Sequence, residues 1–348
     1  MKKILCSIFI FYITALQSQS PSPSFTFNHV FQSDSNGISS VAVKPHAFGG
    51  YWVLGGFNWY GGYSAFYVRE INEIGYSETV HIIDEGYYFS TVYFGGSLQQ
   101  TLNGNYIVAG DKGSNINESD FYLISIANNG NVLWSNQYLS EGSDQATQVI
   151  VTNDNHYLLY GFNQIFYPNG TYEPTRIFLI KTDSNGNELW HTYISSNVIP
   201  LYSEQTLDGG FLISGYQYNN ATGYDMYVVK TNANGEVEWE RTYGTPQNDG
   251  GSRAMQRTDG LIVLIGVIRG EVTTGKLYYA HLNPTNGEVL YSQTHQKYDK
   301  YSPGSSPLLL PDGSLALATL SYGPPPLWEV AFTVFDNSGY IVKEVPIS

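Results

Sequence analysis

Cysteine and charged residues are both scarce in this chain. Only 13% of the residues are charged, and the one cysteine, Cys6, lies in the first apolar segment. Beyond that segment there is no thiol, which excludes disulfides and thiolate chemistry. Positive charge is the scarcer sign, with 16 lysines and arginines against 30 aspartates and glutamates. The formal net charge of −14 repels a phosphate backbone, so no nucleic-acid partner is expected.

Long apolar runs are absent after residue 20. Before it, Lys2 and Lys3 precede the apolar run ILCSIFIFYITAL, which is too short to span a bilayer and is followed by polar QSQSPSPS. We predict a cleaved signal peptide over residues 1–20 and a secreted, cell-surface or periplasmic protein, with an uncleaved anchor as the alternative. Removing Lys2 and Lys3 takes the net charge from −14 to −16, and no integral membrane segment remains.

Recognisable catalytic and metal-binding motifs are also missing. The sequence has no His-Glu-x-x-His pair, no nucleophile elbow and no phosphate-binding loop, and its seven histidines show no metal spacing. Residues 183–187 begin like a calcium loop, but no glutamate stands at the twelfth position, which is Ile194, so we interpret them as a turn. We therefore expect neither a metal nor a cofactor.

Glycine and tyrosine, in contrast, are abundant, with 36 and 30 residues. The stretch DGGFLISG, residues 208–215, places a turn before a short apolar run that stops at glycine. The arrangement recurs six times, and its last residues are Gly55, Gly110, Gly161, Gly215, Gly266 and Thr319. Their spacings are 55, 51, 54, 51 and 53 residues. A period near 50 with strand-like content is typical of a β-propeller.

Each repeat holds four runs with β-strand character, here called strands A to D. The turn between C and D contains Asn-Gly in four of the six repeats, the strongest short hairpin signal. Runs such as FLISG and MYVVK are apolar on both faces, as expected of strands packed between neighbouring sheets. We predict an all-β fold, a single β-propeller domain of six four-stranded blades over residues 21–348. The segment FTFNHVF resembles an extra fourth strand, which leaves a seventh, partial blade open.

The spacing Gly-x-x-x-Trp follows three of these hairpins, ending at Trp134, Trp190 and Trp239, and we expect each ring to pack between blades. Together with the DGG turn and Asn-Gly, the pattern resembles the secreted β-propeller repeats of Bacteroidetes exported proteins over residues 26–348. It is more loosely similar to the quinoprotein-like repeat. Quinoprotein dehydrogenases have eight blades and often a vicinal cysteine pair, both missing here, so their quinone cofactor is not expected. The resemblance implies a fold but no single function.

The loops divide into two kinds. The A–B and C–D turns are tight, whereas the B–C and D–A loops are longer and variable, and antiparallel order places these on the opposite end of each blade. Binding concentrates on such loops. They are rich in aromatic residues, and the candidate ligand-binding residues are Trp59, Tyr60, Tyr88, Phe166, Tyr167, Tyr172, Tyr298 and Tyr301. Their rings suit sugars or protein partners, or else cover the blade ends without a ligand.

Acidic residues recur in the D–A loops, before the innermost strands. These candidate channel-mouth acids are Asp34, Asp144, Asp249 and Asp299. Converging carboxylates can hold a cation or act as an acid–base pair. The competing interpretation, which we favour, is a local turn in which each side chain bonds nearby backbone.

Three functions remain open from the sequence. The first is an exported binding module that takes a glycan or a protein on the B–C/D–A face. The second is a hydrolase or lyase acting on polysaccharide or peptide at the channel mouth, which would need a carboxylate beside another acid, a histidine or an arginine, with Arg253 as the cation to examine. The third is a structural surface module without a small ligand. The first is the leading hypothesis, although the absence of catalytic motifs does not exclude an enzyme, because a propeller active site assembles from one residue per blade.

Overall fold

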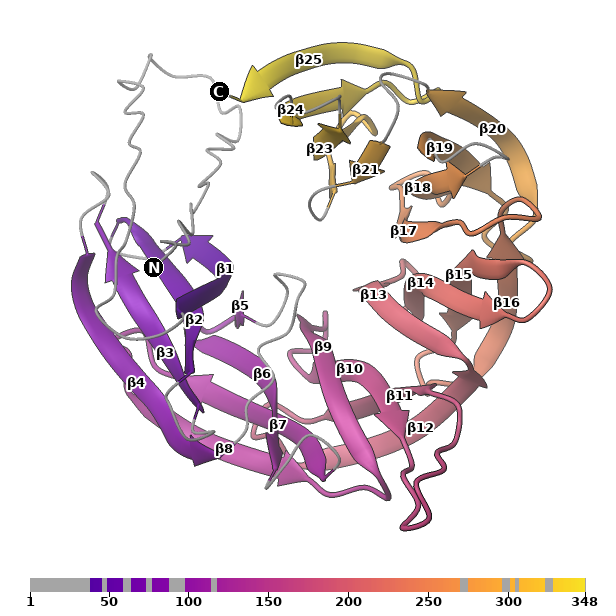
Figure 1. Ribbon diagram of the computed structural model, residues 1–348. Helices are drawn as coiled ribbons and strands as arrows, with labels where there is room; N and C mark the ends of the chain where they lie inside the picture. Colours follow the sequence, from indigo (N-terminus) through magenta and orange to yellow (C-terminus); the bar gives the residue numbers. More distant parts are fainter. Residues whose placement is uncertain are drawn as a thin grey trace, which may run out of the picture. The chain divides into compact units, whose positions relative to one another are not determined.

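The computed structural model describes residues 38–45, 49–58, 64–72, 77–87, 98–113, 118–269, 275–295, 301–303, 307–322 and 328–347. Within these ranges the chain is all β, without helix, and its strands form six antiparallel sheets (Figure 1). The fold is a β-propeller of six four-stranded blades, as the sequence predicts. Strand order follows the chain in every blade. The predicted signal peptide and FTFNHVF lie outside the described residues.

Contact density divides the chain into two compact units, Met1–Val151 and Thr152–Ser348, at the turn after β9. The first unit contains the strands of blades 1 and 2 and β9: β1 (Ile38–Pro45), β2 (Tyr51–Asn58), β3 (Ser64–Ile71), β4 (Ser77–Tyr87), β5 (Leu98–Gln100), β6 (Tyr106–Gly113), β7 (Ser119–Ile126), β8 (Val132–Tyr138) and β9 (Ser143–Val151). The prediction of a single domain over residues 21–348 stays a prediction.

The second unit contains the other strands of blade 3 and blades 4 to 6. Blades 3 and 4 comprise β10 (Tyr157–Gln164), β11 (Arg176–Thr182), β12 (Glu188–Ser196), β13 (Val198–Gln205), β14 (Phe211–Asn219), β15 (Gly223–Thr231) and β16 (Val237–Tyr243). Blades 5 and 6 comprise β17 (Gly250–Gln256), β18 (Ile262–Arg269), β19 (Gly275–Leu282), β20 (Val289–His295), β21 (Tyr301–Pro303), β22 (Leu308–Leu309), β23 (Leu315–Tyr322), β24 (Trp328–Phe335) and β25 (Ile341–Ile347).

Strands B and C of blades 2, 3 and 4 are buried on both faces along most of their length. Leu212 and Val228 of blade 4 pack with Ala254 and Leu264 of blade 5 in one apolar cluster. Each fully buried leucine or valine side chain stabilises the fold by roughly 1.5–3 kcal/mol. This burial explains why these runs are continuously apolar instead of alternating.

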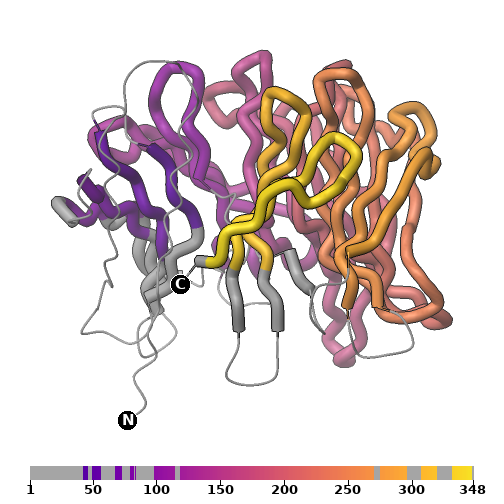
Figure 2. Tube along the Cα trace, turned by 90° about the horizontal axis from the view of Figure 1, so that it is seen from above, coloured from indigo at the N-terminus to yellow at the C-terminus, as the bar shows by residue number. Residues whose placement is uncertain are grey.

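The tight turns are set by residues with positive φ. The A–B turn of blade 5 contains Gly260 at φ 89°, and its C–D turn contains Gly287 at φ 70°. In blade 3 Asn155 takes the A–B position at φ 59°, a conformation that asparagine tolerates better than most residues. In blades 3 and 4 the tight turns lie along one edge and the β10–β11 and β14–β15 loops along the opposite edge (Figure 2). The predicted turn at Asp183 is confirmed, because its carboxylate accepts the backbone N–H groups of Asn185 and Asn187.

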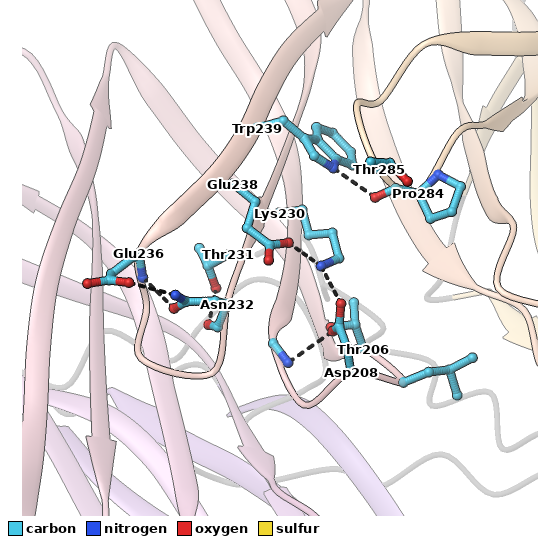
Figure 3. A network of polar contacts seen from close by, with 12 residues as sticks. Thr206, Asp208, Lys230, Thr231, Asn232, Glu236, Glu238, Trp239, Pro284 and Thr285 are labelled. Carbon is cyan, nitrogen blue, oxygen red and sulfur yellow. Dashed lines mark hydrogen bonds and ion pairs between the residues drawn. The ribbon is translucent and has the colours of Figure 1, made fainter.

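The Gly-x-x-x-Trp residues join neighbouring blades. The Trp239 indole N–H of blade 4 donates to the Pro284 carbonyl in the next C–D hairpin at 2.9 Å (Figure 3). The ring lies so close to Gly287 that a Cβ there would meet it at 2.7 Å, and Trp190 stands in the same relation to Gly235. The predicted packing role is confirmed for both tryptophans. Glycine is needed at Gly287 twice over, for its φ and for the ring.

The buried Lys230 stabilises the A–B turn of blade 4 and links it to β16. The Lys230 ammonium donates to Asp208 at 2.6 Å and also bonds Glu238, while Asp208 accepts the Thr206 hydroxyl at 2.5 Å (Figure 3). Partial burial works to raise the pKa of Asp208, but hydrogen bonds from Lys230 and Thr206 outweigh it and hold the pKa at about 2. This network stabilises the turn that opens the DGG repeat.

Candidate functional site

The described residues include part of the predicted ligand-binding set. Phe166, Tyr167 and Tyr172 are described in full, and Tyr301 begins β21. The predicted residues Trp59, Tyr60, Tyr88 and Tyr298 lie outside the described ranges. The candidate surface is therefore built from blades 3 and 4 of the second unit.

The β10–β11 loop is an ordered extension of its hairpin. Phe166 and Tyr172 pair as an isolated β-bridge, and the Tyr167 N–H donates to the Thr171 carbonyl at 2.8 Å. The Tyr167 hydroxyl donates to Glu173 at 2.5 Å. The three rings remain exposed, Tyr172 by 65%. The backbone bonds fix them on a rigid support, which lowers the entropy cost of a contact.

Three tyrosines gather at the same end of blade 4. Tyr218 and Tyr224 pair across β14 and β15, with ring centroids 5.2 Å apart, and Tyr216 lies edge-on to Tyr224 at 5.2 Å. Tyr218 is 46% exposed. The sequence analysis did not single these residues out, although the loop YQYNNATGY contains all three. We call the rings of Phe166, Tyr167, Tyr172, Tyr216, Tyr218 and Tyr224 the aromatic surface.

A strained turn connects the two groups of rings. Ser195, near the end of β12, and Asn197, between β12 and β13, have φ of 45° and 59°. Strand β14 holds this turn, because the Tyr218 N–H donates to the Asn197 carbonyl at 2.8 Å and the Gln217 amide donates to the Ser196 carbonyl at 3.0 Å. Non-glycine residues in this region cost of order 1 kcal/mol or more each and cluster at functional sites.

Arg176 lies on the backbone path that links the two groups of rings. It follows the β10–β11 loop and pairs with Asn163 on one side and Ser196 on the other. Its guanidinium carbon lies 3.8 Å from the Tyr193 ring centroid, and its Nε donates to Asn163 at 2.9 Å. Stacking and this hydrogen bond hold the guanidinium in one orientation.

The predicted channel-mouth acids that are described, Asp144 and Asp249, are both buried. Asp249 accepts the Arg269 N–H at 2.5 Å and also that of Thr245, so it ties a D–A loop to β18. Burial raises the pKa of Asp249 against these hydrogen bonds. Asp144 receives a bond on its carbonyl from the Ser119 hydroxyl at 2.9 Å. Asp34 and Asp299 lie outside the described residues.

A second group of ionisable residues lies on strands β13 and β17, which sequence reasoning missed except for Arg253. The Tyr202 hydroxyl donates to Glu204 at 3.3 Å, and the Gln256 N–H donates to the same carboxylate. Burial raises the pKa of Glu204 to about 7, outweighing both bonds. Burial lowers the pKa of Arg253, whose charge acts on Tyr160 and Tyr202. Tyr202 therefore interacts both with Glu204, whose pKa is about 7, and with the buried guanidinium of Arg253.

Neither a metal-binding cluster nor a membrane-spanning helix occurs among the described residues. They contain no group of three histidine, cysteine, aspartate or glutamate side chains placed to hold a metal ion. They also contain no helix with the length and apolar character needed to cross a membrane.

The comparisons with known proteins address the fold. No protein-family model and no curated protein matches this sequence. A mutant of the Synechocystis apocarotenoid oxygenase is similar, with a TM-score of 0.53 and 11% identity over 88% of this chain and 71% of that one. Proteins of unknown function from Bacteroides caccae and Dyadobacter fermentans score 0.47 and 0.48, at 12% and 10% identity. They cover 81% and 85% of this chain and 90% and 94% of their own.

At this identity, the similarity to the oxygenase shows the fold alone.

Proposed function

We propose that this protein is an exported carbohydrate-binding β-propeller that takes a saccharide on the aromatic surface. One observation carries the proposal: exposed rings on two neighbouring blades are held by hydrogen-bonded backbone beside polar strand ends. Sugars present C–H faces that pack on aromatic rings and hydroxyls that need donors and acceptors. At this strand end the Gln217 amide N–H donates to the Ser196 carbonyl, and the Asn219 oxygen accepts the Ala221 N–H. The Gln217 oxygen and the Asn219 amide N–H therefore supply an acceptor and a donor.

The arrangement of the rings favours a saccharide over a protein partner. The core of a protein interface is a continuous, desolvated apolar area. Here the two groups of rings are separated by the Ser195–Asn197 turn and by Arg176, all of which are polar. Stacking platforms spaced by polar groups suit successive units of a chain of sugars.

The test is a thermal-shift screen of the purified protein against a panel of polysaccharides. A ligand that binds only the folded state raises Tm by mass action. We expect one saccharide class to raise Tm, and Tyr172→Ala and Tyr218→Ala to remove the shift. Tyr340→Ala is the matched control, because Tyr340 is 57% exposed and lies in a C–D turn at the opposite end of its blade. No shift with any saccharide would refute the proposal.

One observation favours a second candidate, a hydrolase or lyase that uses the inner strands. Glu204 has a pKa near that of an efficient general acid or base at neutral pH, and Tyr202 bonds it directly. Incubating the protein with polysaccharides and peptides, followed by analysis of the products, tests this candidate. Turnover lost in Glu204→Gln would support it, whereas unchanged substrates with the unmodified protein would refute it.

A further inference from the structure

The position of Arg176 bears on the class of saccharide, and this inference rests on the proposed function. Arg176 lies four residues along the chain from Tyr172, or about 13 Å in extended backbone. In the other direction, two strand spacings and one residue along the chain separate it from Tyr218, about 13 Å at most. The backbone path from one group of rings to the other therefore runs through Arg176, and a saccharide that follows this path meets the guanidinium.

The guanidinium is oriented without a carboxylate. Among the described residues no carboxylate lies within ion-pair distance of it, since its contacts are the Tyr193 ring and Asn163. Glu173, the acid nearest in sequence, accepts the Tyr167 hydroxyl instead. Nε is used by Asn163, which leaves the two terminal nitrogens as donors. A planar pair of donors matches the two oxygens of an oxyanion.

We propose that Arg176 is the anion-binding residue of the aromatic surface and that the ligand is an acidic polysaccharide carrying carboxylate or sulfate groups. The net charge of −14 makes such a ligand a poor partner for most of this chain. Binding then depends on the positioned cation, and it weakens as salt screens the attraction. The half-buried Arg176 side chain limits that screening compared with a fully exposed one.

The experiment measures binding of the full protein to three probes by isothermal titration: polygalacturonate, dextran sulfate and neutral dextran. We expect at least one acidic probe to bind roughly tenfold more tightly than dextran. Arg176→Gln should remove that difference. Arg176→Lys should retain part of it, because the charge remains while the planar fork is lost. Arg241→Gln, on outer strand β16, is the matched control and should leave every affinity unchanged.

The outcomes separate this inference from the proposed function. Preference for polygalacturonate identifies a carboxylate, and preference for dextran sulfate identifies a sulfate; either supports the inference. Equal binding of acidic and neutral probes, or an unchanged preference in folded Arg176→Gln, overturns the inference and leaves the proposed function standing. Absence of binding to every saccharide overturns both. Melting curves of each variant identify any that fails to fold, and Arg176→Lys then decides the question.

Discussion

Glu204 shows how one residue couples stability to pH. The folded protein raises its pKa from 4.5 to about 7, so the folded state holds this proton more tightly than the unfolded state does. The contribution of Glu204 is therefore fully present below pH 4.5 and is lost as pH rises to about 7. Ionisation costs stability because the carboxylate is removed from water.

We predict that Glu204→Gln raises Tm by about 2 °C or more at pH 8 and leaves it unchanged at pH 5. The glutamine keeps an acceptor for the Gln256 N–H without the charge. Calorimetry at the two pH values measures this, with exposed Glu288→Gln as control. An equal gain at both pH values would show that burial of the charge is not the cause.

The buried Lys230 and its two exposed acidic partners should contribute unequally to the free energy of unfolding. The Lys230 side chain is 4% exposed, whereas the side chains of its partners Asp208 and Glu238 are exposed to solvent by 56% and 42%. Removing both acids together leaves a buried, unpaired ammonium and should cost about 3 kcal/mol. Lys230→Met should cost less than about 1 kcal/mol, because the acids stay hydrated and the apolar stem is kept. Urea denaturation compares the two variants, and equal losses would contradict this account.

At the level of residues, the sequence predicts the local backbone conformation better than it predicts which side chains lie close together in the fold. Asn-Gly and Asp-Gly predict the turns because their backbone preference is local. Tyr218 was missed because its exposure depends on where β14 ends, and nothing in YQYNNATGY marks that point. Glu204 was missed because its raised pKa arises from burial in the folded protein, which no local sequence pattern indicates.

Among the elements, the hairpins of blade 5 offer a matched pair of glycines. A Cβ at Gly287 would meet the Trp239 ring at 2.7 Å, whereas a Cβ at Gly260 has nothing within 4 Å, and both have positive φ. Gly260→Ala should cost about 1 kcal/mol from the backbone alone, and Gly287→Ala about 1 kcal/mol more. Chemical denaturation measures both. Equal costs would mean that the tryptophan contact does not constrain the hairpin.

The β10–β11 extension provides an element-scale test of binding. Its backbone bonds lie mostly within residues 164–173, and its rings are exposed. Replacing residues 165–173 by a two-residue Asn-Gly turn should therefore abolish saccharide binding and change Tm by less than about 2 °C. Titration and a melting curve report the two effects. Binding that survives the replacement would remove this loop from the surface.

At the level of the whole molecule, the repeat predicts the six blades and their strand order because burial on both faces leaves a periodic apolar signal. The period does not reveal the loops that carry the candidate site. Blade 3 has an ordered extension and blade 4 a tyrosine cluster, and both arise where the repeats differ. The strained Ser195–Asn197 turn links the extension to the tyrosine cluster through hydrogen bonds with β14. No local sequence pattern predicts those hydrogen bonds.

The most direct test of the central claim is the affinity of the protein for a bound polysaccharide before and after Tyr172→Ala and Tyr218→Ala are combined. Isothermal titration should show a loss of at least tenfold in the double variant and none in Tyr340→Ala, because only the former removes stacking rings from the aromatic surface. Unchanged affinity in the folded double variant would contradict the claim that saccharides bind at this end of blades 3 and 4.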